Sequence, residues 1–176
     1  MMKAAIFGAS GYTGQELIRI LSGHPQVELV AVTSRRFAGQ PVTDIFPSLR
    51  GLTSLKYQNA APSDIAGTCD VVFLALPHGV SMEVAPVFIA AGKKVIDLSA
   101  DYRLRDAGTY EKWYAQHSSA GILKDAVYGI PELYREKIKK TSLVANPGCY
   151  PTSIILGMAP ALQNRLLDVN TIIADS

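Results

Sequence analysis

Short apolar runs alternate with helical segments along most of this chain, and this alternation restricts the fold more than any other feature of the sequence. Nearly continuous apolar strands separated by helices are typical of a parallel sheet that is covered on both faces. The sequence therefore predicts an α/β fold built on a Rossmann-type, doubly wound and mainly parallel sheet. Strands are expected at 3–7, 27–34, 55–58, 69–77, 93–99, 142–148 and 171–175, helices at 14–25, 80–92 and 149–163, and an irregular stretch at 100–141.

Composition excludes several classes of function. The 176 residues carry 17 basic and 15 acidic side chains, and a net charge of +2 is too small to indicate a nucleic-acid or membrane partner. No apolar run approaches the roughly 20 residues that span a bilayer. The two cysteines, Cys69 and Cys149, resemble neither a disulfide framework nor a metal cluster, so we expect no metal and a reducing, cytoplasmic setting.

A glycine-rich turn follows the first strand. Gly8, Gly11 and Gly14 lie between that strand and the helix that comes next. Glycines at such a turn allow the backbone to approach a pyrophosphate closely, and the helix N-terminus adds unpaired N–H groups and a partial positive charge. The hydroxyls of Ser10 and Thr13 add further donors. The turn predicts a dinucleotide site, with a plain strand-to-helix turn as the alternative.

The end of the second strand discriminates between the two nicotinamide cofactors. NAD-binding units usually carry Asp or Glu there, to hold the ribose 2′-hydroxyl. This chain has Ser34, Arg35 and Arg36 instead. Two guanidinium groups and a hydroxyl suit a 2′-phosphate, which a carboxylate would repel. The prediction is NADP rather than NAD, and a pair of solvated surface arginines is the alternative.

Two later turns are expected at the same edge of the sheet, because ligands in such folds bind beyond the carboxyl ends of the strands. The segment 77–79 is a candidate for the nicotinamide side of the crevice, although for His78 a loop histidine satisfied by the backbone is an equally good interpretation. Ser99 follows the next strand and is a candidate ligand contact. Beyond it, Asp101 and Arg103 could simply pair with each other.

The two cysteines have different settings. Cys69 leads directly into a buried strand and is predicted to be a small buried side chain. Cys149 follows a strand and the turn 146–148 and opens an apolar helix, whose dipole and free amides favour a thiolate and can hold an oxyanion. A thiol nucleophile beside a nicotinamide indicates acyl reduction. Its attack on an activated acyl group gives a thioester, and hydride transfer then gives an aldehyde.

Six motifs together resemble the N-acetyl-gamma-glutamyl-phosphate reductase family, which lies within the wider semialdehyde dehydrogenase superfamily. They are GASGYTGQELIRIL, SRR, LPHG, DLSADYRL, YGIPEL and NPGCYPT, in this order along essentially the whole chain. The resemblance implies NADPH-dependent reduction of N-acetyl-gamma-glutamyl phosphate to its semialdehyde with release of phosphate, in arginine biosynthesis. A related acyl phosphate, aminoadipyl or aspartyl, stays open as the substrate.

The resemblance also implies roles for single residues. Cys149 is implied to be the acyl-forming nucleophile, and Asn146 to orient the substrate. The implied cofactor residues are Gly8, Ser10, Gly11, Tyr12, Thr13 and Gly14 around the phosphates, Ser34, Arg35 and Arg36 at the adenosine end, and Pro77 and Ser99 along the crevice.

The chain departs from the family in length. Residues 1–148 are expected to form the NADP-binding domain, and 149–176 the start of an α+β substrate and dimerisation domain. The chain is thus expected to be a fragment of a homo-oligomeric protein. The family's catalytic histidine has no counterpart among the three histidines, His24, His78 and His117. A truncated, non-catalytic module that binds NADP is therefore the alternative to an active reductase.

Overall fold

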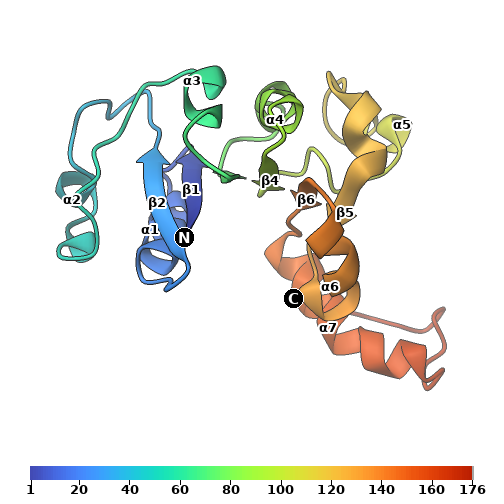
Figure 1. Ribbon diagram of the computed structural model, residues 1–176. Coiled ribbons are helices and arrows are strands. Elements are labelled where there is room, and N and C mark those ends of the chain that lie inside the picture. Colours follow the sequence, from blue (N-terminus) through green and yellow to red (C-terminus); the bar gives the residue numbers. More distant parts are fainter. Residues whose placement is uncertain (176) are drawn as a thin grey trace.

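The computed structural model describes residues 1–175 and contains a six-stranded sheet in the order β2-β1-β3-β4-β6-β5 (Figure 1). Every pair of neighbouring strands in this sheet is parallel. The predicted Rossmann-type parallel sheet is confirmed. The strands are β1 (Met2–Phe7), β2 (Val27–Val32), β3 (Val71–Leu74), β4 (Lys94–Asp97), β5 (Ala126–Tyr128) and β6 (Leu143–Ala145).

Helices and short helical turns connect the strands. They are α1 (Tyr12–Ser22), α2 (Val42–Ile45), η1 (Pro47–Leu49), α3 (Pro62–Ala66), α4 (Ser81–Ala90), α5 (Ala107–Glu111), η2 (Ala120–Asp125), α6 (Pro131–Lys140) and α7 (Cys149–Gln163). Within the described part of the chain, none of these helices has both the length and the apolar character needed to cross a bilayer.

The core lies on both faces of the sheet, because successive side chains of a strand point to opposite faces. In β1, Ala5 and Phe7 pack with side chains of α3 and α4 on one face, and Ala4 and Ile6 pack with α1 on the other. Figure 1 shows α3, α4 and α5 on the first of these faces. Two helix layers thus cover the sheet and bury its central strands.

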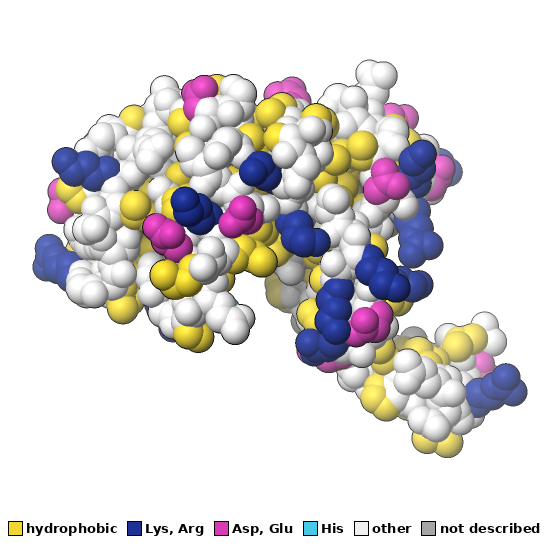
Figure 2. Space-filling model, viewed as in Figure 1, with side chains coloured by type: hydrophobic (Ala, Val, Ile, Leu, Met, Phe, Trp, Pro, Cys, Tyr) yellow, Lys and Arg dark blue, Asp and Glu magenta, His cyan; other side chains and the backbone are white. Residues whose placement is uncertain are grey.

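Helix α7 is the exception to this close packing. Figure 1 shows it extending away from the sheet, and none of its 15 residues is buried. In the space-filling view, hydrophobic side chains lie on the surface of this C-terminal arm (Figure 2). The expected division at residue 148 stays a prediction, and Ser176, the last residue of the second expected unit, lies outside the described residues.

Two predicted strands do not form. Over 55–58 there are only isolated bridges, from Lys56 to Pro41 and from Gln58 to Thr33, because β2 ends at Val32 and offers no continuous ladder. Residues 171–175 have no regular structure, and Ile173 is 92% exposed. No neighbouring strand among residues 1–175 meets them, and a strand without a partner is not stable in water.

Seven elements formed where none was expected: α2, η1, α3, α5, η2, β5 and α6. The short helix α3 begins at Pro62, a residue favoured in the first helical turn, but spans too few residues to show a period. The stretch 100–141, expected to be irregular, contains α5, β5 and α6. Strand β5 has only three residues, all half-buried, and is too short to show a period. Helix α6 does have its apolar side chains Leu133, Tyr134 and Ile138 half-buried, but most of its residues are charged.

Candidate functional site

The glycine turn before α1 has the tight geometry that a phosphate-binding loop requires. Gly8 has φ +80°, and a Cβ added there would lie 2.3 Å from the carbonyl oxygen of Ala75. A Cβ on Gly14 would lie 2.5 Å from backbone atoms of Ala9. Gly11, the N-cap residue, has nothing within 4 Å of its Cβ position, and no side chain of residues 1–175 caps the helix. The first amides of α1 are therefore open to an anion.

The end of β2 is tied to this turn. The Ser34 hydroxyl donates to the Ser10 hydroxyl at 3.0 Å, and the Thr33 hydroxyl accepts from the Gly8 amide at 3.3 Å. Beneath the turn, the buried Tyr57 hydroxyl donates to the Ala9 carbonyl at 3.4 Å, and burial raises the pKa of Tyr57 to about 12. The predicted phosphate and adenosine residues are thus brought together by the fold.

Arg35 and Arg36 lie exposed directly beyond Ser34. The guanidinium carbon of Arg36 lies 5.0 Å from the centroid of the Phe37 ring, a cation–π contact. Among residues 1–175, the ion pairs are Glu16–Arg19 and Glu136–Lys139, so both guanidinium groups of this turn lack a carboxylate partner. They are available to a solvent-borne anion such as a 2′-phosphate.

The turns after β3 and β4 are joined by hydrogen bonds. The backbone amide of Ala100 donates to His78 Nδ1 at 2.9 Å, so His78 is held by the backbone and carries its proton on Nε2 when neutral. Pro77 is exposed beside it. Ser99, by contrast, is 1% exposed, and its hydroxyl donates to Asp97 Oδ2 at 2.7 Å. The side chain of Ser99 therefore faces the protein, its amide also donates to Asp97 at 3.2 Å, and its role as a cofactor contact stays a prediction.

Asp101 and Arg103 do not pair with each other, which corrects one interpretation of the sequence. The Asp101 carboxylate accepts from the amides of Gly79 and Met82, at the start of α4. The Arg103 guanidinium donates from Nε to the Asn146 carbonyl at 2.8 Å and from Nη2 to the Leu98 carbonyl at 2.9 Å. Each charged group satisfies backbone groups of a neighbouring turn instead.

Cys149 is exposed and is the first residue of α7. Gly148 is its N-cap, and no side chain of the described residues caps this helix either. A Cβ added at Gly148 would lie 3.3 Å from Arg103 Nη1, so a guanidinium group lies beside the start of α7. Asn146 is half-buried, and its amide nitrogen donates to the Pro147 carbonyl at 3.2 Å. A thiol, open amides and a cation thus meet at one helix end.

A pocket of about 390 Å³ opens next to Arg103. Its lining is Arg103, Arg105, Val127, Tyr128, Tyr134 and Lys137, which is three cations and two phenols without a carboxylate. Burial raises the pKa of the Tyr128 hydroxyl, while the charge of Arg103 acts in the opposite direction. The pocket has the donors and the charge to hold an anion.

Sequence patterns did not reveal this pocket, Tyr57 or Asp97. The pocket residues come from segments that looked irregular, and nothing in the sequence marks Tyr57. A signal for Asp97 did exist, because it ends a strand at the edge where ligands bind. In the part of the chain that the structure describes, no cluster of three or more His, Cys, Asp or Glu side chains could hold a metal ion.

Comparisons with known proteins identify a family and relatives that this chain resembles. A family model described as "Semialdehyde dehydrogenase, NAD binding domain" matches residues 3–141. An N-acetyl-gamma-glutamyl-phosphate reductase from Desulfotalea psychrophila is 57% identical over 176 residues, which are 100% of this chain and 51% of that protein. The protein of the same name from Nitrosococcus oceani is 49% identical over 177 residues, 100% of this chain and 52% of that protein. The chain spans about half the length of the curated relatives it matches.

Solved structures share the fold. An aspartate semialdehyde dehydrogenase with NADP from Candida albicans superposes with a TM-score of 0.70 at 23% identity, covering 93% of this chain and 47% of that chain. The aspartate semialdehyde dehydrogenase II from Vibrio cholerae in complex with ASA gives 0.67 at 19% identity, covering 93% and 47%. RSP, a Rex-family repressor, gives 0.52 at 13% identity, covering 94% and 62%. Because an enzyme and a repressor both match, these likenesses concern the fold alone.

Proposed function

Because this chain belongs to the semialdehyde dehydrogenase family through its NAD-binding domain, we propose that it supplies the cofactor site and the nucleophile of an acyl-phosphate reductase. The proposed substrate is N-acetyl-gamma-glutamyl phosphate, the substrate in the name of relatives up to 57% identical to this chain. The observation that carries the proposal is the exposed Cys149 thiol, at the open N-terminus of α7, on the sheet edge that also carries the glycine turn.

The proposed cofactor is NADPH. The glycine turn fits its pyrophosphate for two reasons. The backbone around Gly8 and Gly14 leaves no room for a side chain, and the first amides of α1 are uncapped. Arg35 and Arg36 lie exposed and without ion-pair partners in the described chain, which suits the 2′-phosphate. When bound, NADPH supplies the hydride that reduces the acyl group to an aldehyde.

In the proposed reaction the Cys149 thiolate attacks the acyl carbon of the substrate. A carbon–sulfur bond forms, the bond from the acyl carbon to the phosphate oxygen breaks, and phosphate leaves with the electron pair. The uncapped amides of α7 lie where they can stabilise the oxyanion of the tetrahedral intermediate. After hydride transfer to the carbonyl carbon, the carbon–sulfur bond breaks, which releases the semialdehyde and restores the thiolate.

The basic pocket supports an anionic substrate. It adjoins Arg103, whose Nη1 lies beside Gly148, and its further cations are Arg105 and Lys137. An acyl phosphate with a carboxylate carries two anionic groups, and this pocket provides one place for such a group next to the nucleophile.

The function is tested by fusing this chain to the C-terminal half of the Desulfotalea psychrophila relative and following NADPH oxidation with the acyl phosphate. We expect turnover by the fusion and its loss in Cys149→Ala. Cys69→Ala is the matched control, because Cys69 is 2% exposed and lies away from the proposed chemistry. Undiminished turnover in Cys149→Ala would overturn the mechanism. Aspartyl and aminoadipyl phosphates in the same assay test the related substrates.

A non-catalytic module that binds NADP is the second candidate. It is favoured by the settings of the histidines: His117 is buried against the Asp101 carbonyl, and His78 is held by the Ala100 amide. Helix α7 does not separate the two candidates: it carries apolar side chains on all sides and buries none, which suits a helix that further protein covers in either case. A second domain or a further copy of the chain would provide that cover. Turnover by the 176-residue chain alone would exclude this candidate.

A further inference from the structure

The carboxylate of Asp101 is fully buried and lies at a junction of three elements. Its Oδ1 accepts from the Gly79 amide at 2.9 Å and from the Tyr110 hydroxyl at 2.9 Å. Its Oδ2 accepts from the Gly79 amide at 3.0 Å and from the Met82 amide at 3.2 Å. Within residues 1–175 it has no ion pair, so the N-terminus of α4 and a phenol balance its charge.

These bonds fasten the turn after β3 to the turn after β4. Gly79 has φ +85°, a left-handed conformation, and its amide points at Asp101. On the other side, the Asp101 amide donates to the Ser99 hydroxyl at 3.1 Å. The bond from the Ala100 amide to His78 is a second link between the same turns. The Asp101 carboxylate therefore makes most of the hydrogen bonds that hold the segment 77–79 against the turn after β4.

The segment 107–117 also contacts Asp101, through Tyr110 and His117. Tyr110 is 0% exposed, stacks on Tyr114 at 4.8 Å between ring centroids, and meets His117 edge-on at 5.0 Å. His117 Nε2 lies 2.8 Å from the Asp101 carbonyl oxygen. Because each partner is itself packed, the carboxylate has one orientation available to it.

We propose that Asp101 is a positioning residue for the nicotinamide end of the cofactor, an inference that rests on the proposed function. Asp101 is buried and touches no ligand itself. It acts by holding the turn 77–79, whose Pro77 is exposed, in the arrangement that a nicotinamide ring packs against. The same bonds occupy amides at the N-terminus of α4, so these amides are not free to bind a phosphate.

Asp101→Asn is the informative substitution. Both carboxylate oxygens accept from N–H or O–H donors, so either orientation of an Asn amide places its NH₂ group against a donor. Tyr110→Phe removes one hydrogen-bond donor to the carboxylate and keeps the hydrogen bonds from the backbone amides of Gly79 and Met82. Asp106→Asn is the matched control, because Asp106 is an exposed acid that caps α5 through the Thr109 amide.

The experiment measures the affinity of the 176-residue chain for two ligands by calorimetry. NADPH spans the whole crevice, whereas adenosine 2′,5′-bisphosphate reaches only the adenosine end. That end follows β2, three strands from β4 and therefore roughly 14 Å away. We expect Asp101→Asn to weaken NADPH about tenfold and Tyr110→Phe about threefold, as the loss of buried hydrogen bonds predicts. The bisphosphate affinity should stay within about twofold in each variant, and Asp106→Asn should change neither.

Equal losses for both ligands, or unchanged NADPH affinity in both test variants, would overturn the positioning role. If Asp101→Asn does not fold, Tyr110→Phe decides alone: a loss confined to NADPH supports the role, and no loss overturns it. A folded wild-type chain that binds neither ligand would instead contradict the proposed function.

Discussion

The hydroxyl of Ser34 donates a 3.0 Å hydrogen bond to the hydroxyl of Ser10, which joins the end of β2 to the glycine turn before α1. The same Ser34 oxygen accepts a hydrogen bond from the Phe37 amide at 3.3 Å, so the chain makes a turn that contains the two arginines. The glycine turn and the arginine pair are therefore one structural unit, although they are more than twenty residues apart in the sequence.

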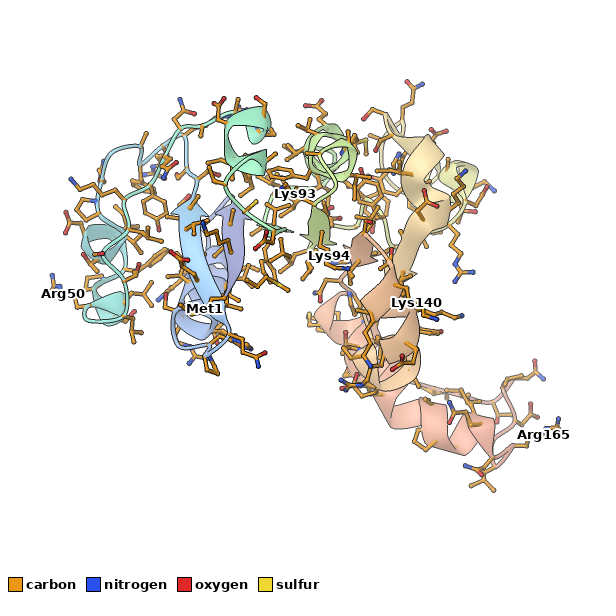
Figure 3. All side chains as sticks on the ribbon, in the orientation of Figure 1. Met1, Arg50, Lys93, Lys94, Lys140 and Arg165 are labelled. Carbon is orange, nitrogen blue, oxygen red and sulfur yellow. The ribbon has the colours of Figure 1, made fainter. Side chains whose placement is uncertain are left out.

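The first prediction concerns this unit. The double substitution Arg35→Ala, Arg36→Ala should weaken NADPH binding roughly tenfold or more, because charge-assisted bonds to a phosphate contribute about 1.5–3 kcal/mol. NADH lacks the 2′-phosphate and should bind the variant as it binds the wild type. Arg50→Ala is the control, an exposed arginine beside η1 that is labelled in Figure 3. Equal losses for both cofactors in a titration would refute the 2′-phosphate assignment.

The second prediction separates the glycines by their surroundings. Gly8→Ala should lower the free energy of unfolding by roughly 2–4 kcal/mol, because a Cβ would lie 2.3 Å from a carbonyl oxygen at φ +80°. Gly11→Ala meets open space and should change the unfolding free energy by no more than about 1 kcal/mol. Urea unfolding of both variants checks this, and similar stabilities would contradict the turn geometry.

The third prediction concerns the two thiols. Cys149 is exposed, whereas Cys69 is 2% exposed and burial raises the pKa of its thiol. Because the thiolate is the reactive form, iodoacetamide should alkylate the folded chain at Cys149 and spare Cys69. Peptide mass spectrometry distinguishes the two sites. In urea both should react, and equal labelling without urea would show that Cys69 is more accessible than its burial indicates.

The fourth prediction follows from the buried carboxyl of Asp97. Burial raises the pKa of Asp97, against the opposing effect of hydrogen bonds from Ser99, so the folded state holds this proton more tightly than the unfolded chain. Its contribution to stability is complete below the ordinary value of about 3.9 and is lost as the pH rises through the raised folded value. Relative to wild type, Asp97→Asn should therefore gain stability as the pH rises from about 4 through the raised folded value.

Urea unfolding across this pH range gives the measurement for Asp97. Asp44→Asn is the control, since it makes the same chemical change at an exposed position. A difference between wild type and Asp97→Asn that does not vary with pH would count against a raised pKa of Asp97 in the folded state.

Local patterns predicted much of the fold. The parallel sheet, α1, α4 and α7 were expected from apolar runs and from the residues that bound them, and the family resemblance of the motifs is confirmed by the match over residues 3–141. Strand β5 and helix α6 were not predicted. Strand β5 depends on pairing with β6, a segment further along the chain, and α6 packs on β5 once that strand is in place. The strand expected at 171–175 does not form, because no strand of the described chain pairs with it.

The sequence by itself determined which chemical groups this protein can use. The glycine turn, the arginine pair and the cysteine after Asn-Pro-Gly are local features, and each follows from backbone freedom or charge within a few residues. Only the tertiary structure decided how polar side chains of separate turns are oriented. The Asp101 carboxylate accepts hydrogen bonds at the N-terminus of α4 instead of pairing with Arg103, and the Ser99 hydroxyl donates to the buried Asp97. A buried charge must satisfy whichever donors the fold places around it, and those donors come from segments that the local sequence does not specify.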